Sequence, residues 1–147
     1  MSTAKVSPIP DGYRTITPYL LVEGAAAFID FAKKALAAEV VSRADAPNGL
    51  VMNAVLKIGD SMLMCADPKP GNPPIPSMFY LYVTDTDAWY ARAIAAGAES
   101  AMKPADQFYG DRNAGVKDSF GNQWWFATRV EDVSDSEIAK RAQALKQ

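Results

Sequence analysis

The sequence repeats itself about 61 residues apart. Residues 19–22 (Tyr-Leu-Leu-Val) are followed by an Ala-rich stretch and an Ala-Glu pair at 38–39. The same succession returns with residues 80–83 (Tyr-Leu-Tyr-Val), a second Ala-rich stretch and an Ala-Glu pair at 98–99. Self-similarity with such a period indicates that one supersecondary unit occurs twice and that each copy builds half of the fold.

Two modules of similar length follow from the repeat, 13–67 and 77–131. The linker 68–76 between them holds five prolines and favours an extended connection. A chain of 147 residues, of which 49% are hydrophobic, is long enough to bury a core without disulfides. We therefore expect one domain that is built from two tandem modules.

The hydrophobic pattern predicts the same order of elements in each module. In the first module, β-branched and aromatic residues over 17–22 are typical of a strand. A helix over about 25–37 is predicted by apolar residues at helical spacing, namely Phe28, Phe31, Ala32, Ala35 and Leu36. Three short strands follow at 39–43, 51–58 and 61–65, with turns at Asn48-Gly49 and Gly59-Asp60.

The second module starts with a strand over 78–83 and continues into a helix that a short oxygen side chain within 84–87 caps. This helix ends near Gly97, where a left-handed residue is needed, and its inward residues are Trp89, Tyr90, Ala93 and Ile94. Strands complete the unit at 100–103, 114–117 and 123–128. The predicted fold class is α+β, with the order βαβββ repeated and one helix on one face of each four-stranded sheet.

A final helix is predicted over 134–146. Ser134 and Glu137 have the spacing of a capping box. Ile138, Ala142 and Leu145 share one stripe of this helix. We expect the stripe to pack on the body of the protein or on a partner subunit.

The residue types that the chain lacks exclude several kinds of chemistry. It contains no histidine and one cysteine, Cys65. A Ser-His-Asp triad, a Cys-His pair, a histidine-rich zinc site and an internal disulfide are therefore excluded. No imidazole can activate the thiol of Cys65, which we predict to be a small buried residue rather than a nucleophile.

Charge and hydropathy bear on possible partners. The formal net charge of −2 leaves no basic excess to neutralise phosphates. No apolar run reaches the roughly 18 residues that a membrane-spanning helix needs. Residues 1–10 lack the basic start and apolar run of a secretory signal. We expect a cytoplasmic protein that binds neither nucleic acid nor membranes.

Three groups of residues carry a resemblance to a known family: the segment 10–20 (PDGYRTITPYL), Tyr109-Gly110-Asp111-Arg112, and the run 118–128 (DSFGNQWWFAT). Together with the repeated βαβββ order, they resemble the PhnB-like branch, also called demethylubiquinone methyltransferase-like, of the vicinal oxygen chelate superfamily. This superfamily includes glyoxalase I, bleomycin resistance proteins and extradiol dioxygenases. The resemblance covers about 10–141. It implies two half-barrels around a shared cavity, and a homodimer.

The resemblance also implies where a metal would be held. Enzymes of the superfamily bind a divalent metal through His, Gln or Glu on the first and last strands of each module, which correspond here to Tyr19, Met64, Tyr80 and Trp125. None of these side chains is a metal ligand at pH 7. Asn53 and Asn122 stand where relatives often carry histidine. We therefore expect no metal and no cofactor, unless unrelated carboxylates such as Asp111 or Glu99 converge.

The positions on the strands are candidates for binding a small organic ligand instead. Tyr19 and Tyr80 either present hydroxyl groups to a ligand or fill the half-barrels as ordinary strand residues. Trp125 points opposite to its two neighbours along the strand. By the family register it faces the cavity, where its indole either stacks on a ligand or packs the core. Asn53 either offers amide hydrogen bonds or is an ordinary polar residue of a strand.

The segment 108–112 is a further candidate, as a loop that roofs the cavity. Arg112 either offers its guanidinium to a carboxylate or phosphate, or Asp111 and Arg112 pin a hairpin through a backbone bond and a salt bridge. The complete set of candidate ligand-binding residues is Tyr19, Asn53, Met64, Tyr80, Phe108, Tyr109, Asp111, Arg112 and Trp125.

Two functions are compatible with these features. The first is a metal-free protein that sequesters or carries a small, largely apolar or planar molecule in an aromatic-lined cavity between the modules, as bleomycin resistance proteins do. The alternative is a lyase or isomerase of the superfamily with a non-standard metal site or none, which would use the phenols and Asp111. A methyltransferase, suggested by the name of the branch, would need a Gly-rich cofactor turn after a strand, and the sequence has none.

Overall fold

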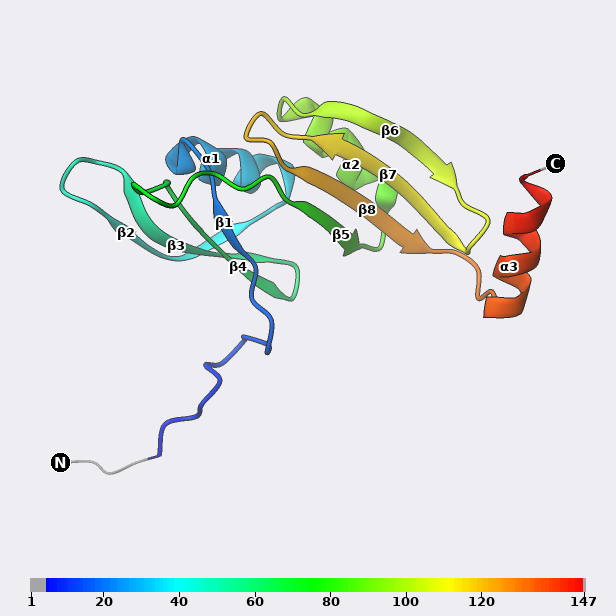
Figure 1. The fold of residues 1–147 in the computed structure, drawn as a ribbon, viewed down its shortest axis with the longest axis horizontal. Coiled ribbons are helices and arrows are strands. Elements are labelled where there is room, and N and C mark those ends of the chain that lie inside the picture. The colour runs from blue at the N-terminus through cyan, green and yellow to red at the C-terminus, as the bar shows by residue number, and fades with distance from the viewer. Residues whose placement is uncertain (1–4, 147) are drawn as a thin grey trace. The chain divides into compact units, whose positions relative to one another are not determined.

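A computed structural model describes residues 5–146 of the chain (Figure 1). Two four-stranded sheets each carry one helix, and a third helix follows at the C-terminus. The chain divides into two compact units, one up to Ile75 and the other from Pro76 on, except that residues 34–36 group with the second. The predicted order βαβββ is confirmed in both repeats.

The first repeat contains β1 (Tyr19–Leu21), α1 (Ala25–Ala35), β2 (Glu39–Asp45), β3 (Val51–Ile58) and β4 (Ser61–Ala66). Its sheet has the order β1-β4-β3-β2, in which β1 is parallel to β4 and the other neighbours are antiparallel. The second repeat contains β5 (Met78–Tyr82), α2 (Thr86–Ala95), β6 (Glu99–Asp106), β7 (Asp111–Lys117) and β8 (Gln123–Arg129). Its order, β5-β8-β7-β6, is the same.

Helix α1 buries an apolar stripe that differs slightly from the predicted one. Ile29 is buried, whereas Phe31 is only half-buried. The helix also ends at Ala35 rather than 37, because Ala37 turns left-handed with φ 51°. The N–H of Ala38 then donates to the carbonyl oxygen of Ala32 at 3.2 Å, which closes the helix end.

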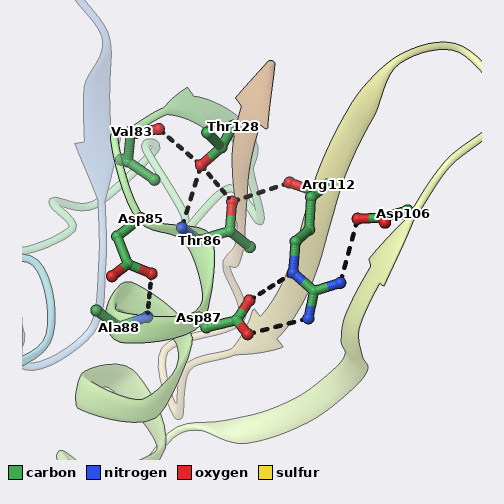
Figure 2. A network of polar contacts seen from close by, with 8 residues as sticks. All are labelled: Val83, Asp85, Thr86, Asp87, Ala88, Asp106, Arg112 and Thr128. Atoms are coloured by element: carbon green, nitrogen blue, oxygen red, sulfur yellow. Dashed lines mark hydrogen bonds and ion pairs between the residues drawn. The ribbon is translucent and has the colours of Figure 1, made fainter. Parts of the chain in front are cut away.

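Helix α2 begins and ends where the sequence predicts. Asp85 is the N-cap, and its carboxylate accepts the N–H of Ala88 at 3.1 Å (Figure 2). Gly97 follows the C-cap with φ 105°. Only Thr86 and Ala93 are fully buried on this helix. Tyr90 is half-buried and Ile94 exposed, so the inward stripe is narrower than predicted.

In each repeat, a side chain on the last strand or directly after it accepts hydrogen bonds from the N-terminus of the helix. In the first repeat, the Asp67 carboxylate directly after β4 accepts the N–H groups of Gly24 and Ala25, each at 3.0 Å. In the second repeat, the Thr128 hydroxyl of β8 accepts the N–H of Thr86 at 3.1 Å (Figure 2). The repeat therefore preserves an acceptor for a helix N-terminus while changing its chemistry.

Two strand boundaries differ from the prediction. Strand β6 continues past Pro104, with an irregularity in its register between Met102 and Ala105 that accommodates the proline. Strand β7 starts at Asp111 rather than at 114. Asp111 and Arg112 therefore lie on a strand, and their side chains point to opposite faces of the sheet instead of sharing a loop.

The run 118–128 contains the turn between β7 and β8, over 118–122, and most of β8. The buried Asp118 carboxylate accepts the N–H groups of Phe120 at 2.8 Å and Asn122 at 2.9 Å, and the indole N–H of Trp124 at 2.8 Å. Asn122 accepts the N–H of Ser77 at 3.0 Å through its Oδ1. These residues of the motif thus fix the hairpin and its attachment to the start of β5.

Helix α3 (Asp135–Ala144) confirms the predicted C-terminal helix. Ser134 is its N-cap and accepts the N–H of Glu137 at 3.2 Å. Arg141 holds the helix to its own repeat by donating to both carboxylate oxygens of Glu131 and to the carbonyl oxygen of Phe108. No helix among the described residues is long and apolar enough to cross a membrane.

Cys65 lies on β4 and is fully buried, as predicted. Burial and the nearby Asp67 carboxylate raise the pKa of its thiol to about 11. We expect the folded protein to react with a disulfide reagent such as DTNB at pH 8 at least about 100-fold more slowly than the urea-unfolded chain, because thiolate is scarce and covered. Absorbance at 412 nm measures the rate. Equal rates would show that the thiol is exposed.

Candidate functional site

The second sheet has one face covered by α2 and one face that α2 leaves uncovered. Trp124 and Phe126 are buried on the covered face, where the Phe126 ring lies 5.8 Å from that of Trp89. Because side chains alternate along a strand, Trp125 belongs to the uncovered face. Tyr80 lies beside Trp125 in the β5–β8 ladder, and Gly115 lies on its other side in β7.

Five residues of this uncovered face form one polar network, which we call the tyrosine cluster: Tyr80, Tyr82, Tyr109, Asp111 and Asn113. The Asp111 carboxylate is 6% exposed and accepts the phenol O–H groups of Tyr80 at 2.7 Å and Tyr82 at 2.9 Å, both on Oδ2. The amide of Asn113, which is 3% exposed, donates to the phenol oxygens of Tyr80 at 3.1 Å and Tyr109 at 2.6 Å.

The protons in the cluster have only one consistent arrangement. A carboxylate only accepts, so Tyr80 and Tyr82 must both donate to Asp111. Tyr80 then accepts from Asn113, and the second N–H of the same amide is accepted by Tyr109. The phenol proton of Tyr109 has no acceptor among the described residues. Oδ1 of Asn113 is buried and likewise has no hydrogen-bond partner there.

The carboxylate keeps the phenols protonated. Burial and the Asp111 carboxylate raise the pKa of Tyr80, against the opposing effect of the Asn113 amide. The hydrogen bond to Asp111 and partial burial raise the pKa of Tyr82. Both phenols are therefore neutral hydrogen-bond donors at physiological pH and are poor sources of a phenolate.

Trp125 lies flat against the backbone of Gly115. A Cβ at Gly115 would come within 2.6–2.7 Å of three indole carbons, so only glycine leaves room for this ring position. The indole N–H donates to Oε1 of Gln123 at 3.1 Å. In the first repeat, Val55 and Met64 occupy the equivalent pair of positions. The half-buried indole thus forms an aromatic platform that the first repeat lacks.

Arg112 alternates with Asp111 and Asn113 along β7 and so belongs to the opposite face of the sheet. Figure 2 shows its side chain reaching Asp87 on α2 and Asp106 on β6. Its guanidinium binds Asp87 through two hydrogen bonds of 2.8 and 3.0 Å and Asp106 through one of 3.2 Å. These two carboxylates raise its pKa. The Asp111–Arg112 salt bridge considered from the sequence is absent from the ion pairs of the described residues, and the guanidinium is already engaged on the opposite face.

The remaining candidate residues are divided between the two units. Phe108 lies edge-on against Tyr109, with ring centroids 5.1 Å apart. In the first unit, Tyr19 lies beside Met64 in the β1–β4 ladder, and Asn53 lies on β3 with its Oδ1 buried and unpartnered among the described residues. The structure thus brings Tyr80, Tyr109, Asp111 and Trp125 together on one sheet face. It places Tyr19, Asn53 and Met64 on the other sheet.

Three residues of the uncovered face escaped the sequence analysis: Tyr82, Asn113 and Gly115. Two of them carried a usable signal. Tyr82 follows Tyr80 at the spacing of two that puts both on one face of a strand. Asn113 is the repeat equivalent of Asn53. Asn53 pairs with Ala44 in the neighbouring strand and Asn113 pairs with Ala105, and these two alanines are 61 residues apart in the sequence. Gly115 carried no signal in the sequence, because its role depends on the contact with the Trp125 indole.

The residues at the family's metal positions do not fit a divalent ion. Tyr80 donates its phenol proton to Asp111, and Trp125 offers only an N–H and ring carbons. Tyr19 and Met64 supply a neutral phenol and a thioether. No three Asp, Glu or Cys side chains within residues 5–146 are placed to hold a metal. Glu99 and Asp111 lie at opposite ends of the β6–β7 ladder.

A tandem βαβββ repeat, with the same strand order in both four-stranded sheets, defines the class of protein. A family model described as the Glyoxalase/Bleomycin resistance protein/Dioxygenase superfamily matches residues 15–126. The chain belongs to this superfamily. An uncharacterised protein of Mycobacterium bovis is 35% identical, with 84% of this chain and 88% of the relative covered. A protein of Mycobacterium tuberculosis is also 35% identical, with 84% and 79% covered.

Solved structures share the fold at lower identity. TioX from Micromonospora sp. ML1 superposes with a TM-score of 0.69 at 21% identity, covering 80% of this chain and 99% of that one. A PhnB protein from Bacillus cereus, described as a putative 3-demethylubiquinone-9 3-methyltransferase, gives a TM-score of 0.64 at 19% identity, with 78% and 99% covered. At these identities the likeness establishes the fold.

Proposed function

We propose that this protein binds a small, largely apolar or planar organic molecule without a metal, and that it sequesters or carries that molecule. The observation that carries the proposal is the uncovered face of the second sheet. There the Trp125 platform stands beside the tyrosine cluster at the positions where metal-dependent relatives carry ligands. The prediction that the binding cavity lies between the two modules stays a prediction.

The chemistry of the face favours binding over catalysis. An indole surface supplies apolar area and stacking for a planar ring. Next to it, the free phenol proton of Tyr109 offers one directional hydrogen bond. A small number of polar groups beside aromatic walls is the usual composition of a small-molecule site. Neutral phenols whose protons are committed to a carboxylate provide no strong base.

Substitution of the platform tests the proposal. We expect Trp125→Ala to weaken binding of 2-naphthylmethanol, a neutral planar probe, by roughly tenfold, because the stacking surface is lost. Isothermal titration calorimetry measures the affinity. Tyr90→Ala removes an aromatic ring from the helix side of the same sheet and should leave the affinity unchanged. Equal affinities of the Trp125→Ala variant and the unmodified protein would show that the ligand does not bind at the Trp125 platform.

One observation favours a second candidate, a lyase or isomerase. The Tyr80 phenol donates to a buried carboxylate at 2.7 Å, and such a pair can shuttle a proton to or from a bound substrate. The two candidates separate on the behaviour of a bound molecule. NMR spectroscopy of a compound retained by the purified protein should show an unchanged spectrum after incubation if the protein is a carrier. It should show a new compound, a cleaved one for a lyase or an isomer of equal mass for an isomerase, if the protein is an enzyme.

A further inference from the structure

We propose that the molecule bound on this face is an organic cation, an ammonium group on an aromatic or apolar body. This inference rests on the proposed function, since it concerns the same face and names the charge of its ligand. It starts from the buried carboxylate of Asp111, whose charge the protein surrounds with neutral groups.

Asp111 has no ion pair among the described residues. Its hydrogen-bond donors are the two neutral phenols of Tyr80 and Tyr82, both on Oδ2. Arg112 lies on the opposite face and binds Asp87 and Asp106. A buried carboxylate without a countercharge is costly, because neutral donors replace only part of its hydration. A cationic ligand would supply the missing charge.

Arg129 is the cation that pairs with Asp111 across the sheet. It lies opposite Asp111 in the β7–β8 ladder, but its guanidinium forms its ion pair with Asp132. Arg129 therefore moderates the negative potential of the face without occupying the carboxylate. The second oxygen of Asp111, Oδ1, accepts no hydrogen bond from the described residues and remains available to an ammonium N–H.

The rings around the carboxylate are suited to a cation. Tyr80 and Tyr82 meet edge to face, with centroids 5.4 Å apart, and are 45% and 65% exposed. The indole of Trp125 stands beside Tyr80. Aromatic faces attract ammonium groups electrostatically, and several rings around one anionic group form the usual recognition site for organic ammonium ions. Oδ1 of Asn113, buried and unpartnered, adds a further negative dipole beneath them.

Three probes that share one ring and differ in charge test the inference: 2-naphthylmethylammonium, neutral 2-naphthylmethanol and 2-naphthoate. In calorimetric titrations at pH 7, we expect the ammonium to bind roughly tenfold more tightly than the alcohol, and the carboxylate to bind more weakly than either. Asp111→Asn keeps the size and one acceptor of the side chain but removes its charge. This variant should bind the ammonium and the alcohol about equally.

Asp106→Asn is the matched control. Asp106 is an exposed carboxylate on the opposite face, so its loss changes the net charge equally without touching the cluster. This variant should keep the full preference for the ammonium. An alcohol that binds as tightly as the ammonium would overturn the inference and leave the proposed function standing. Failure of all three probes to bind at millimolar concentration would overturn both.

Discussion

Replacing Asp67 with alanine is expected to destabilise the protein by about 3–4 kcal/mol. The Asp67 side chain is 6% exposed and accepts three backbone N–H groups, from Gly24 and Ala25 at 3.0 Å and from Val51 at 2.7 Å. One carboxylate thus joins the start of α1 to the start of β3. Alanine would leave these buried donors without acceptors, and each unsatisfied group costs about 1–3 kcal/mol, with less than additive effect.

Urea unfolding followed by circular dichroism measures the change. Thr128→Val is the matched control in the second repeat, where the hydroxyl accepts one helix N–H and donates to the carbonyl oxygen of Val83 at 2.8 Å. We expect that variant to lose only about 1–1.5 kcal/mol. A loss at Asp67 no greater than at Thr128 would show that the charged acceptor has no special importance.

The effect of Asp67 should depend on pH. Although burial opposes it, the three N–H donors lower the pKa of this carboxyl group. A lowered folded pKa means that the stabilisation is fully present above the unfolded value of about 3.9 and is lost as the pH falls through the folded value. The difference in unfolding free energy between the unmodified protein and Asp67→Ala should therefore shrink below about pH 4.

Replacing Gly110 with alanine is the second change for which we expect a large effect, a loss of about 3 kcal/mol. Gly110 has φ 102°, a conformation that residues with a side chain rarely adopt. A Cβ at this position would also overlap the carbonyl oxygen of Glu131 and come within 3.1 Å of the Cγ2 of Val133. The backbone must shift, since a carbonyl cannot rotate away as a side chain can.

Gly97→Ala separates the two causes. Gly97 has nearly the same φ, 105°, but nothing lies within 4 Å of its hypothetical Cβ. This variant should lose only about 1 kcal/mol, the cost of the left-handed backbone alone. Thermal unfolding by calorimetry compares the two variants. Similar losses would mean that the contact with Glu131 relaxes freely.

The Gly110 variant also links the Tyr-Gly-Asp-Arg motif to the site. Gly110 stands between Tyr109 and Asp111, and its carbonyl oxygen accepts the N–H groups of Val130 and Glu131. A shift of this backbone would move the Tyr109 phenol away from Asn113 and the Asp111 carboxylate away from Tyr80 and Tyr82. The motif therefore serves the site through geometry, because glycine allows the chain to turn and place both side chains on one face.

The sequence predicted the elements well because their signals are local. Strand and helix periodicity, the caps Asp85 and Ser134 and the left-handed Gly97 all depend on residues within one or two turns. The errors occurred where tertiary contacts decided. The predicted strand 100–103 stops before Pro104, whereas β6 continues to Asp106 through an irregularity in its register. The start of β7 was placed late because Asp111 and Arg112 are not typical strand residues.

The candidate site was only partly predictable, and Arg112 shows why. From the sequence, its guanidinium was a candidate for binding a ligand anion. In the structure, α2 brings Asp87 against it and β6 brings Asp106, so the charge is already satisfied on the covered face (Figure 2). A sequence shows that a cation is present, but the packing of distant elements determines whether a carboxylate of the same chain reaches it first.

By itself, the sequence determined the repeated βαβββ unit, the absence of imidazole and the replacement of the family's metal ligands by phenols, a thioether and an indole. These properties depend on composition and on spacing along the chain. Only the tertiary structure decided that Tyr80, Tyr82 and Tyr109 meet over Asp111 and Asn113, and that Trp125 rests on Gly115. Strand register sets these contacts across as many as 33 residues of sequence, and no local pattern encodes it.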